Sequence, residues 1–336
     1  MKRILVTGAA GFIGSNFARR ALRQHEDWQV CAFDALTYAG NLSNLEGLDD
    51  TGRFEFVRGD ICDEGAANAV FESGLWAVVN FAAESHVDRS IHGAADFVRT
   101  NVLGTQVLLD LARRHEVPRF LQISTDEVYG SLGPEGKFTE DTPLAPNSPY
   151  SASKAGADML ARSYYETHGF PILITRCSNN YGPYQFPEKV IPLFVTNLLE
   201  GQTVPLYGDG MNIRDWIHVY DHCDALMAVL ERGEPGRVYN IGGDHELTNL
   251  ELTHRIIAEL GKDESVIERV KDRLGHDRRY AIDGTRIKDE LGWSPRIDFA
   301  SGLTETVQWY RQNESWWRAI KTGEYLEYYK LQYGAA

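Results

Sequence analysis

The sequence has 336 residues, more than one hydrophobic core usually supports, so its length predicts two domains or one large α/β unit. With 43% hydrophobic and 24% charged residues, the composition is that of a globular chain and argues against disorder or fibrous repeats. Asp and Glu outnumber Lys and Arg by 48 to 34, and the net charge of −14 disfavours general nucleic-acid binding because it repels a phosphate backbone.

The first half alternates short apolar runs with longer amphipathic segments. This alternation predicts a Rossmann-type α/β fold, in which a doubly wound parallel sheet is covered by helices on both faces. The expected strands are Arg3–Thr7, Gln29–Asp34, Phe54–Arg58, Ala77–Ala82, Arg119–Ser124 and Ile172–Arg176. The expected helices between them include Gly14–Gln24, Ala94–Arg114 and Pro149–His168.

After about residue 178 the pattern changes to isolated helices and short strands interrupted by Gly and Pro. We therefore expect residues 1–178 to form a Rossmann-type domain. Residues 179–336 should form a smaller α/β domain, with some segments returning to the first. Its expected helices are Ile191–Leu199, Asp221–Arg232, Asn249–Leu260 and Phe299–Asn313. The prolines between Pro134 and Pro149 predict a long ordered loop, and the aromatic tail from Trp309 should dock on the body.

The cysteines and the hydropathy pattern bear on the compartment. Cys31, Cys62, Cys177 and Cys223 are widely spaced and form no C-x-x-C pair, which favours reduced thiols over disulfides or a zinc site. No stretch approaches the ~20 apolar residues that a membrane span needs, and glycines interrupt the apolar start of the chain. We expect a cytoplasmic protein.

A glycine-rich turn follows the first strand. Gly8, Gly11 and Gly14 let the chain turn sharply and let backbone N–H groups approach a pyrophosphate at a helix N-terminus. The alternative is a plain strand–helix turn, but the position directly after a strand favours a nucleotide site. Asp34 ends the second strand, where a carboxylate can accept from a ribose diol or merely cap a turn. No Arg follows it to receive a 2′-phosphate, so NAD is favoured over NADP.

Tyr150 and Lys154 open a helix after the proline-rich loop, one turn apart on the same face. A tyrosine ionises near pH ~10, so it is a poor base at neutral pH; a neighbouring cation favours the phenolate, and moving the pKa by ~3 units takes about 4 kcal/mol of interaction. This spacing often arises by chance, and it gains weight from the glycine turn earlier in the chain.

Thr125, Asp126 and Glu127 stand at the end of the fifth strand. Ser124 and Glu127 fit a helix capping box, which is the structural alternative. Both carboxylates can serve one site only if the strand ends here, and ligands bind at such strand ends in open parallel sheets. Two acids beside a hydride-accepting cofactor predict an acid and a base besides the tyrosine.

Cations gather in the acidic second half of the chain. Arg214 and the run from Asp272 to Arg279 offer guanidinium groups that suit a diphosphate, although surface ion pairing is the alternative. His86 and Asp88 lack the spacing of a metal site, and we expect no catalytic metal.

The chain resembles the extended short-chain dehydrogenase/reductase family in its glycine triplet, Asp34, Asp60-Ile61, the Phe81–Ser85 turn, Tyr150 and Lys154. Within that family it resembles the dTDP-glucose 4,6-dehydratase branch in Thr125–Glu127, Ser178–Pro183, Arg214–His218 and Gly275–Tyr280. The resemblance covers residue 1 to roughly residue 310. Related 4-epimerases lack the acid pair. The one departure noted is Leu274, where the branch has Pro.

The resemblance implies a reaction. Tyr150, activated by Lys154 and held in register with Thr125, takes the proton of the glucose C4 hydroxyl while a hydride passes to NAD⁺. Glu127 removes the C5 proton, Asp126 protonates the leaving C6 hydroxyl, and the hydride returns to C6. The product is dTDP-4-keto-6-deoxyglucose. Because the cofactor ends as it began, tightly bound NAD is expected. The resemblance also implies that residues 1–178 form the NAD-binding domain with the catalytic residues, and that residues 179–336 form mainly the sugar-nucleotide-binding domain.

The resemblance also implies contact residues. The dinucleotide should be lined by Gly8, Gly11, Phe12, Ile13, Gly14, Asp34, Leu36, Thr37, Asp60, Ile61, Phe81, Ala82, Ala83, Ser85, Thr100, Tyr150, Lys154 and Asn180. The sugar nucleotide should be faced by Glu84, Thr125, Asn179, Lys189, Val190, Pro205, Tyr207, Arg214, Asn249, Arg273 and His276. Among these, Pro205 and Tyr207 offer flat surfaces to the pyrimidine, whereas Lys189, Arg214 and Arg273 offset the diphosphate charge.

Similar proteins pair through the helices near Ala94–Arg114 and Pro149–His168, so a homodimer built on a four-helix bundle is expected. The alternatives are a related 4-epimerase or decarboxylase, and a non-catalytic NAD-binding regulator on the same fold. A regulator need not keep Asp126, Glu127, Tyr150 and Lys154 together, and this chain has all four. The preference for dTDP over another nucleotide rests on the resemblance alone.

Overall fold

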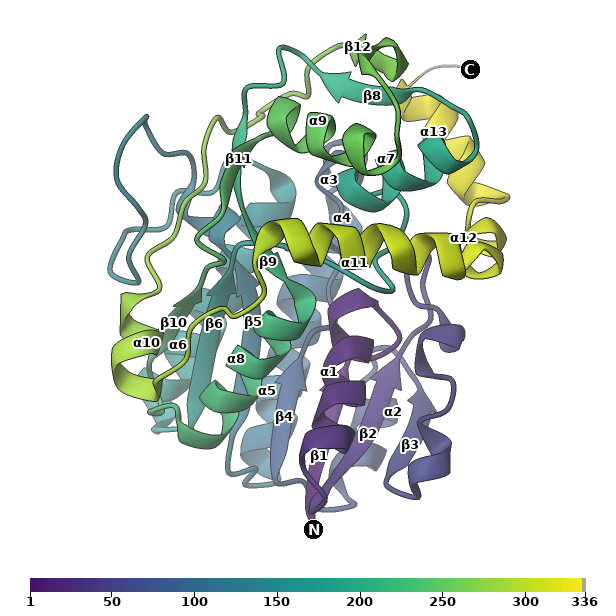
Figure 1. Ribbon diagram of the computed structural model, residues 1–336. Coiled ribbons are helices and arrows are strands. Elements are labelled where there is room, and N and C mark those ends of the chain that lie inside the picture. The colour runs from purple at the N-terminus through teal and green to yellow at the C-terminus, as the bar shows by residue number, and fades with distance from the viewer. Residues whose placement is uncertain (334–336) are drawn as a thin grey trace.

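A seven-stranded parallel sheet forms the centre of the molecule (Figure 1). The computed structural model describes residues 1–333. The strand order is β10-β6-β5-β4-β1-β2-β3, which reverses direction between β1 and β4. The strands of this sheet are β1 (Lys2–Thr7), β2 (Trp28–Asp34), β3 (Phe54–Arg58), β4 (Ala77–Asn80), β5 (Phe120–Thr125), β6 (Ile172–Cys177) and β10 (Val238–Ile241). The predicted Rossmann-type fold is confirmed, with strand ends shifted by one or two residues.

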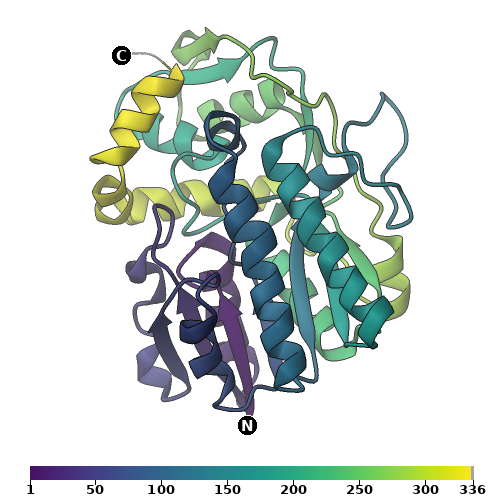
Figure 2. The same ribbon diagram turned by 180° about the vertical axis from the view of Figure 1, so that it is seen from behind.

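Helices cover both faces of the sheet, as its near-continuous apolar strands require. On one face α1 (Phe12–Gln24) packs against α8 (Val219–Arg232), and on the other α5 (Thr105–Arg114) lies between α2 (Glu64–Phe71) and α6 (Pro149–His168) (Figures 1 and 2). The remaining short elements beside this sheet are η1 (Leu42–Leu45), η2 (Asp49–Thr51), α3 (Val87–His92), η4 (Asp126–Tyr129) and α10 (Thr285–Leu291).

The single helix predicted over residues 94–114 is wrong in its middle. The segment consists of α4 (Ala95–Phe97), a π-helical stretch η3 (Val98–Gly104) and then α5. The wider turn carries Asn101, whose side chain accepts from the Glu84 amide at 2.8 Å and donates to the Glu84 carbonyl at 3.0 Å. The same side chain donates to Ser153 of α6 at 2.8 Å. The irregular turn therefore fixes the loop that follows β4.

The second half of the chain covers the carboxyl ends of the strands. Its two small sheets have the orders β11-β9-β7 and β12-β8, and an apolar core drawn from residues 181–317 lies beneath them. The strands are β7 (Asn179–Tyr181), β8 (Val204–Tyr207), β9 (Ile213–His218), β11 (Glu246–Thr248) and β12 (Ile267–Val270). The helices are α7 (Val190–Leu199), α9 (Asn249–Glu259), η5 (Glu264–Val266), α11 (Phe299–Gln312), α12 (Glu314–Ile320) and α13 (Glu324–Tyr333).

Two features connect the halves. β10 and α8 come from the second half yet belong to the first sheet and its helical cover. The aromatic tail docks on the body as the sequence predicts, because Tyr310, Trp317 and Tyr325 are buried. Across residues 1–333, the structure has no helix long and apolar enough to cross a membrane.

Candidate active site

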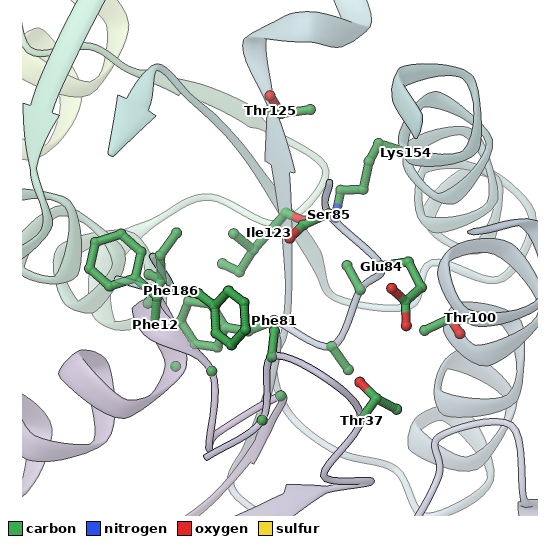
Figure 3. A pocket seen from close by; sticks show the side chains of 18 of the residues that line it. Phe12, Thr37, Phe81, Glu84, Ser85, Thr100, Ile123, Thr125, Lys154 and Phe186 are labelled. Atoms are coloured by element: carbon green, nitrogen blue, oxygen red, sulfur yellow. The ribbon is translucent and has the colours of Figure 1, made fainter. Parts of the chain in front are cut away.

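A cavity of about 510 Å³ opens at the carboxyl ends of the central strands, where the strand order reverses (Figure 3). Ligands of doubly wound sheets bind at this position because loops from neighbouring strands diverge there. The loops after β1, β2, β4, β5 and β6 all line the cavity, and the segment 185–189 closes it from the second half.

The glycine turn forms the floor of the cavity. Gly8 has φ +63°, which favours glycine, and a Cβ there would lie 2.7 Å from the Ala82 nitrogen. Gly11 serves as the N-cap of α1 without a capping side chain, so the first amides of the helix face the cavity rather than a protein acceptor. An anionic group such as a pyrophosphate fits this arrangement.

Asp34 closes β2 beside this turn. Its two carboxylate oxygens accept from the amides of Ala10 at 2.9 Å and Leu36 at 2.8 Å, which fixes the orientation of the side chain. Burial raises the pKa of this carboxyl, whereas the two amides lower it. Asp34 also lines the cavity, so it fits the ribose position of a dinucleotide. Together the glycine turn and Asp34 form a cradle that suits NAD.

The tyrosine and the lysine share one helix. Ser148 caps α6 through a reciprocal pair of hydrogen bonds with Ser151, and Pro149 starts the first turn, which places Tyr150 and Lys154 at the cavity. The Lys154 ammonium donates to the Ile123 carbonyl at 2.6 Å. Burial lowers the pKa of Lys154, and it raises the pKa of Tyr150 well above its usual value with help from the Glu127 charge. Without an added positive charge, Tyr150 is a neutral phenol.

The two acids follow the end of β5. Thr125 is the last strand residue and caps the short turn η4, its hydroxyl accepting from the Glu127 amide at 3.3 Å. Because the strand ends at Thr125, Asp126 and Glu127 are not forced onto opposite faces of the sheet, and both line the cavity. Asp126 is 1% exposed, and its Oδ2 has no hydrogen-bond partner among the residues described.

The surroundings of the two carboxyls differ. Burial, then the charges of Glu127 and Asp215, raise the pKa of Asp126 well above its usual value, which favours the protonated form of this side chain. Burial also raises the pKa of Glu127, but Arg273, Arg214 and Lys189 counteract the rise. One carboxyl is thereby suited to give a proton and the other to accept one.

Most of the sequence-predicted residues line this cavity. The dinucleotide set does so except for Leu36, which packs on the apolar core with φ +55°. From the substrate set, Glu84, Thr125, Asn179 and Lys189 line it. The members that do not line it are Val190, Pro205, Tyr207, Arg214, Asn249, Arg273 and His276.

Part of that outer set gathers beyond the cavity. The Tyr207 hydroxyl donates to Asp88 at 3.3 Å, and Arg273 lies 3.7 Å from the same carboxylate. The ring of His276 is 6.1 Å from that of Tyr207. Gln332 of α13 donates to the Tyr207 hydroxyl at 2.7 Å, so the C-terminal helix contacts the residue expected beside the pyrimidine. Arg214 instead donates to the backbone carbonyls of Ile213 and Asp277.

Sequence reasoning missed several residues of the cavity wall. They are Phe33, Ala35, Ala39, Gly40, Gly59, Asp96, Arg99, Ile123, Ser124, Cys177, Ser178, Gln185, Phe186 and Glu188. Many are small or apolar and carry no recognisable pattern. Arg99 could have been found from its position next to Thr100, and in the structure it pairs with Asp60 at 2.8 Å. Within residues 1–333, no group of three or more His, Cys, Asp and Glu side chains is arranged to hold a metal ion.

Comparison with known proteins places this geometry in a family. Residues 5–306 match the family model described as GDP-mannose 4,6 dehydratase. A dTDP-glucose 4,6-dehydratase of Streptomyces niveus is 55% identical, over 95% of this chain and 96% of that protein. The crystal structure of DesIV, the dTDP-glucose 4,6-dehydratase of Streptomyces venezuelae, with NAD bound superimposes with a TM-score of 0.93. It is 54% identical and covers 95% of this chain and all of its own (100%).

A more distant neighbour shares the fold. The UDP-glucuronic acid 4-epimerase of Bacillus cereus has a TM-score of 0.86 at 28% identity, over 92% of this chain and 99% of its own. The fold and the cavity thus define an NAD-dependent enzyme of the extended short-chain dehydrogenase/reductase class. Epimerases and dehydratases share this class, and the sequence identities of 54–55% to dehydratases against 28% to the epimerase separate the two. The chain belongs to the dTDP-glucose 4,6-dehydratase family.

Proposed function

We propose that this enzyme removes water from dTDP-glucose to give dTDP-4-keto-6-deoxyglucose, a precursor for deoxysugar biosynthesis. The observation that carries the proposal is one cavity that unites the glycine turn, Tyr150, Lys154 and the acid pair Asp126 and Glu127. An epimerase needs only the first three of these features, since it neither eliminates water nor moves a C5 proton. The names of the 54–55% identical relatives support the same substrate.

The residues divide the chemistry between them. NAD⁺, held by the glycine turn and Asp34, would supply the acceptor for the C4 hydride and the donor of that hydride to C6, and its positive ring would lower the pKa of a nearby phenol. Tyr150 takes the proton of the C4 hydroxyl, with Lys154 stabilising the phenolate. The resulting ketone acidifies the C5 hydrogen, which Glu127 removes. Asp126, whose protonated form is favoured by burial, donates a proton to the C6 hydroxyl as it leaves as water. Glu127 finally returns its proton to C5.

The first experiment is to incubate the purified protein with dTDP-glucose and no added NAD. The expected product has lost one water by mass spectrometry and shows the near-ultraviolet absorbance of a 4-keto-6-deoxy sugar in alkali. Both signals together support the dehydratase and its retained cofactor. A product of unchanged mass would identify an epimerase instead.

We also infer a division of labour within the chain. Residues 1–178 carry the cofactor and the catalytic groups, and residues 179–336 mainly bind the sugar nucleotide. The separate apolar core of residues 181–317 supports this boundary, with β10, α8 and α10 as the segments that return. The four free cysteines are in keeping with a reducing cytoplasm as the site of action.

We further propose a homodimer formed through η3, α5 and α6. These helices lie side by side on the outer face of the molecule (Figure 2), and they expose Val98 (55%), Leu103 (46%) and Met159 (45%). Large apolar side chains on adjacent exposed helices are typical of a four-helix-bundle interface. Leu103→Glu with Met159→Glu should yield a monomer by light scattering. Leu274→Glu, at a side chain that is 72% exposed elsewhere, is the control. A double variant of unchanged mass would refute this interface.

A further inference from the structure

Glu188 joins two walls of the cofactor cavity. It lies just before α7 and lines the cavity, yet its side chain is only 3% exposed. The Tyr38 hydroxyl donates to its Oε1 at 3.0 Å, and the Arg89 guanidinium donates to its Oε2 at 3.2 Å. Each carboxylate oxygen therefore accepts one side-chain hydrogen bond, and the two donors come from different parts of the first half; the His86 Nε2 also lies 3.9 Å from Oε2.

The Tyr38 side of this junction belongs to the loop that holds the ribose end of the cavity. Asp34, Thr37 and Gly40 of that loop all line the cavity. The Tyr38 ring has the Arg89 guanidinium 4.1 Å from its centre, and the nearly perpendicular Phe186 ring has its centre 5.6 Å from that of Tyr38. Phe186 also lines the cavity, as do Phe12 and Phe81 (Figure 3).

The segment that carries Glu188 is held from two further directions. Lys189 donates to the Ser85 carbonyl at 2.9 Å, which ties the segment to the loop after β4. On the outside, the Tyr325 hydroxyl of α13 donates to the Pro187 carbonyl at 3.0 Å. The segment 185–189 is thus fixed between the cavity and the C-terminal helix.

The charges at the junction support ionic contacts. Glu188 is nearly buried, and burial raises the pKa of its carboxyl, while Lys189 and Arg89 oppose that rise. Hydrogen bonds that a guanidinium donates are charge-assisted and stronger than neutral ones. Removing the acceptor would leave the Tyr38 hydroxyl and the Arg89 guanidinium without their carboxylate.

We propose that Glu188 is a positioning residue that holds the cofactor cavity closed through Tyr38 and Arg89 and thereby retains NAD between turnovers. The reaction leaves the cofactor in its starting state, so turnover requires no exchange of NAD. The inference rests on NAD as the cofactor and not on the identity of the sugar nucleotide. The contacts proposed to retain NAD join Glu188 to Tyr38 and Arg89, and the sequence analysis assigned none of these three residues to the site.

The test measures NAD release from the holoenzyme without any substrate. Protein carrying labelled NAD is mixed with excess unlabelled NAD, and the label that remains bound is followed with time. Glu188→Gln should release NAD about tenfold faster than the wild type, because a charge-assisted hydrogen-bond pair is weakened. Tyr38→Phe, which removes only one hydroxyl, should give a smaller increase of about threefold.

Glu200→Gln is the matched control, because it makes the same chemical change at the far end of α7, outside the cavity. This variant should release NAD at the wild-type rate. Equal release rates for wild type, Glu188→Gln and Tyr38→Phe would overturn the proposal. If Glu188→Gln does not fold, Tyr38→Phe alone decides it. Faster release together with a full dehydration rate at saturating NAD supports retention. Loss of dehydration with unchanged release would show a role in chemistry and overturn it.

Discussion

The ion pair between Asp158 and Arg176 allows a quantitative test of how the catalytic helix is held. Asp158 lies on α6 four residues beyond Lys154, and its side chain is 0% exposed. The Arg176 guanidinium, 4% exposed on β6, donates to Asp158 at 2.9 Å and to the Tyr129 hydroxyl at 2.9 Å. Asp158→Asn leaves the arginine charge buried without its counter-ion.

Breaking such a pair costs about 3–5 kcal/mol of unfolding free energy. With a urea dependence of roughly 3 kcal/mol per molar, the unfolding midpoint should fall by at least about 1 M. Replacing both partners with apolar residues, as in Asp158→Leu with Arg176→Met, removes both charges and should recover most of the loss. Urea titrations followed by circular dichroism measure all three midpoints.

The same helix supplies the control. Arg162 and Glu166 form an exposed pair on α6, with side chains 60% and 55% exposed. Glu166→Gln should change the unfolding free energy by less than about 1 kcal/mol, because exposed pairs contribute little. Equal midpoints for Asp158→Asn and Glu166→Gln would refute the reasoning that burial decides the contribution of the pair.

Three further outcomes are expected. Glu127→Gln should leave C4 oxidation possible but slow water loss by about 10²–10⁴-fold, so that reduced nicotinamide accumulates and is detected by its absorbance. Elimination at a near wild-type rate would exclude Glu127 as the C5 base. Gly8→Ala should yield protein with little bound NAD by extraction and quantification, because its Cβ would meet the Ala82 backbone at 2.7 Å; full NAD occupancy would contradict this. Burial lowers the pKa of His222 to about 3, so the unfolded state alone takes up its proton below about pH 6.5, and stability should fall as the pH drops from there toward 3. Urea midpoints at pH 7 and 5 measure this, and an equal pH dependence in His222→Asn would refute it.

Sequence patterns predicted the alternating strands and helices and the polar side chains at the strand ends. The apolar runs of β1 to β6 and the polar groups at their carboxyl ends follow from parallel-sheet geometry, so both the fold and the cavity position could be predicted. Tyr150 and Lys154 were found because helical periodicity places both on one face. Asp126 and Glu127 were found because a polar turn ends an apolar strand.

Contacts between distant segments could not be predicted in this way. The π-helical turn at Asn101 depends on the Glu84 backbone, which only the fold brings near. Glu188 meets Tyr38 and Arg89 across separations of 150 and 99 positions, and none of the three belongs to a recognisable motif. Tyr207 was expected beside a pyrimidine, and its contact with Gln332 depends on where the C-terminal helix docks. Periodicity and spacing report on neighbours in the chain, whereas these contacts are set by tertiary packing.

The position of β10 has a consequence for how the chain is made. Residues 238–241 pair in parallel with β6 and form the last strand of the central sheet. During synthesis, the backbone N–H and C=O groups on the outer edge of β6 stay unpaired until some sixty further residues, up to β10, have left the ribosome. An uncovered strand of this kind invites pairing with other chains. A fragment that stops at residue 178 should therefore aggregate. The central sheet of the first half is complete only when β10 of the second half has paired with β6.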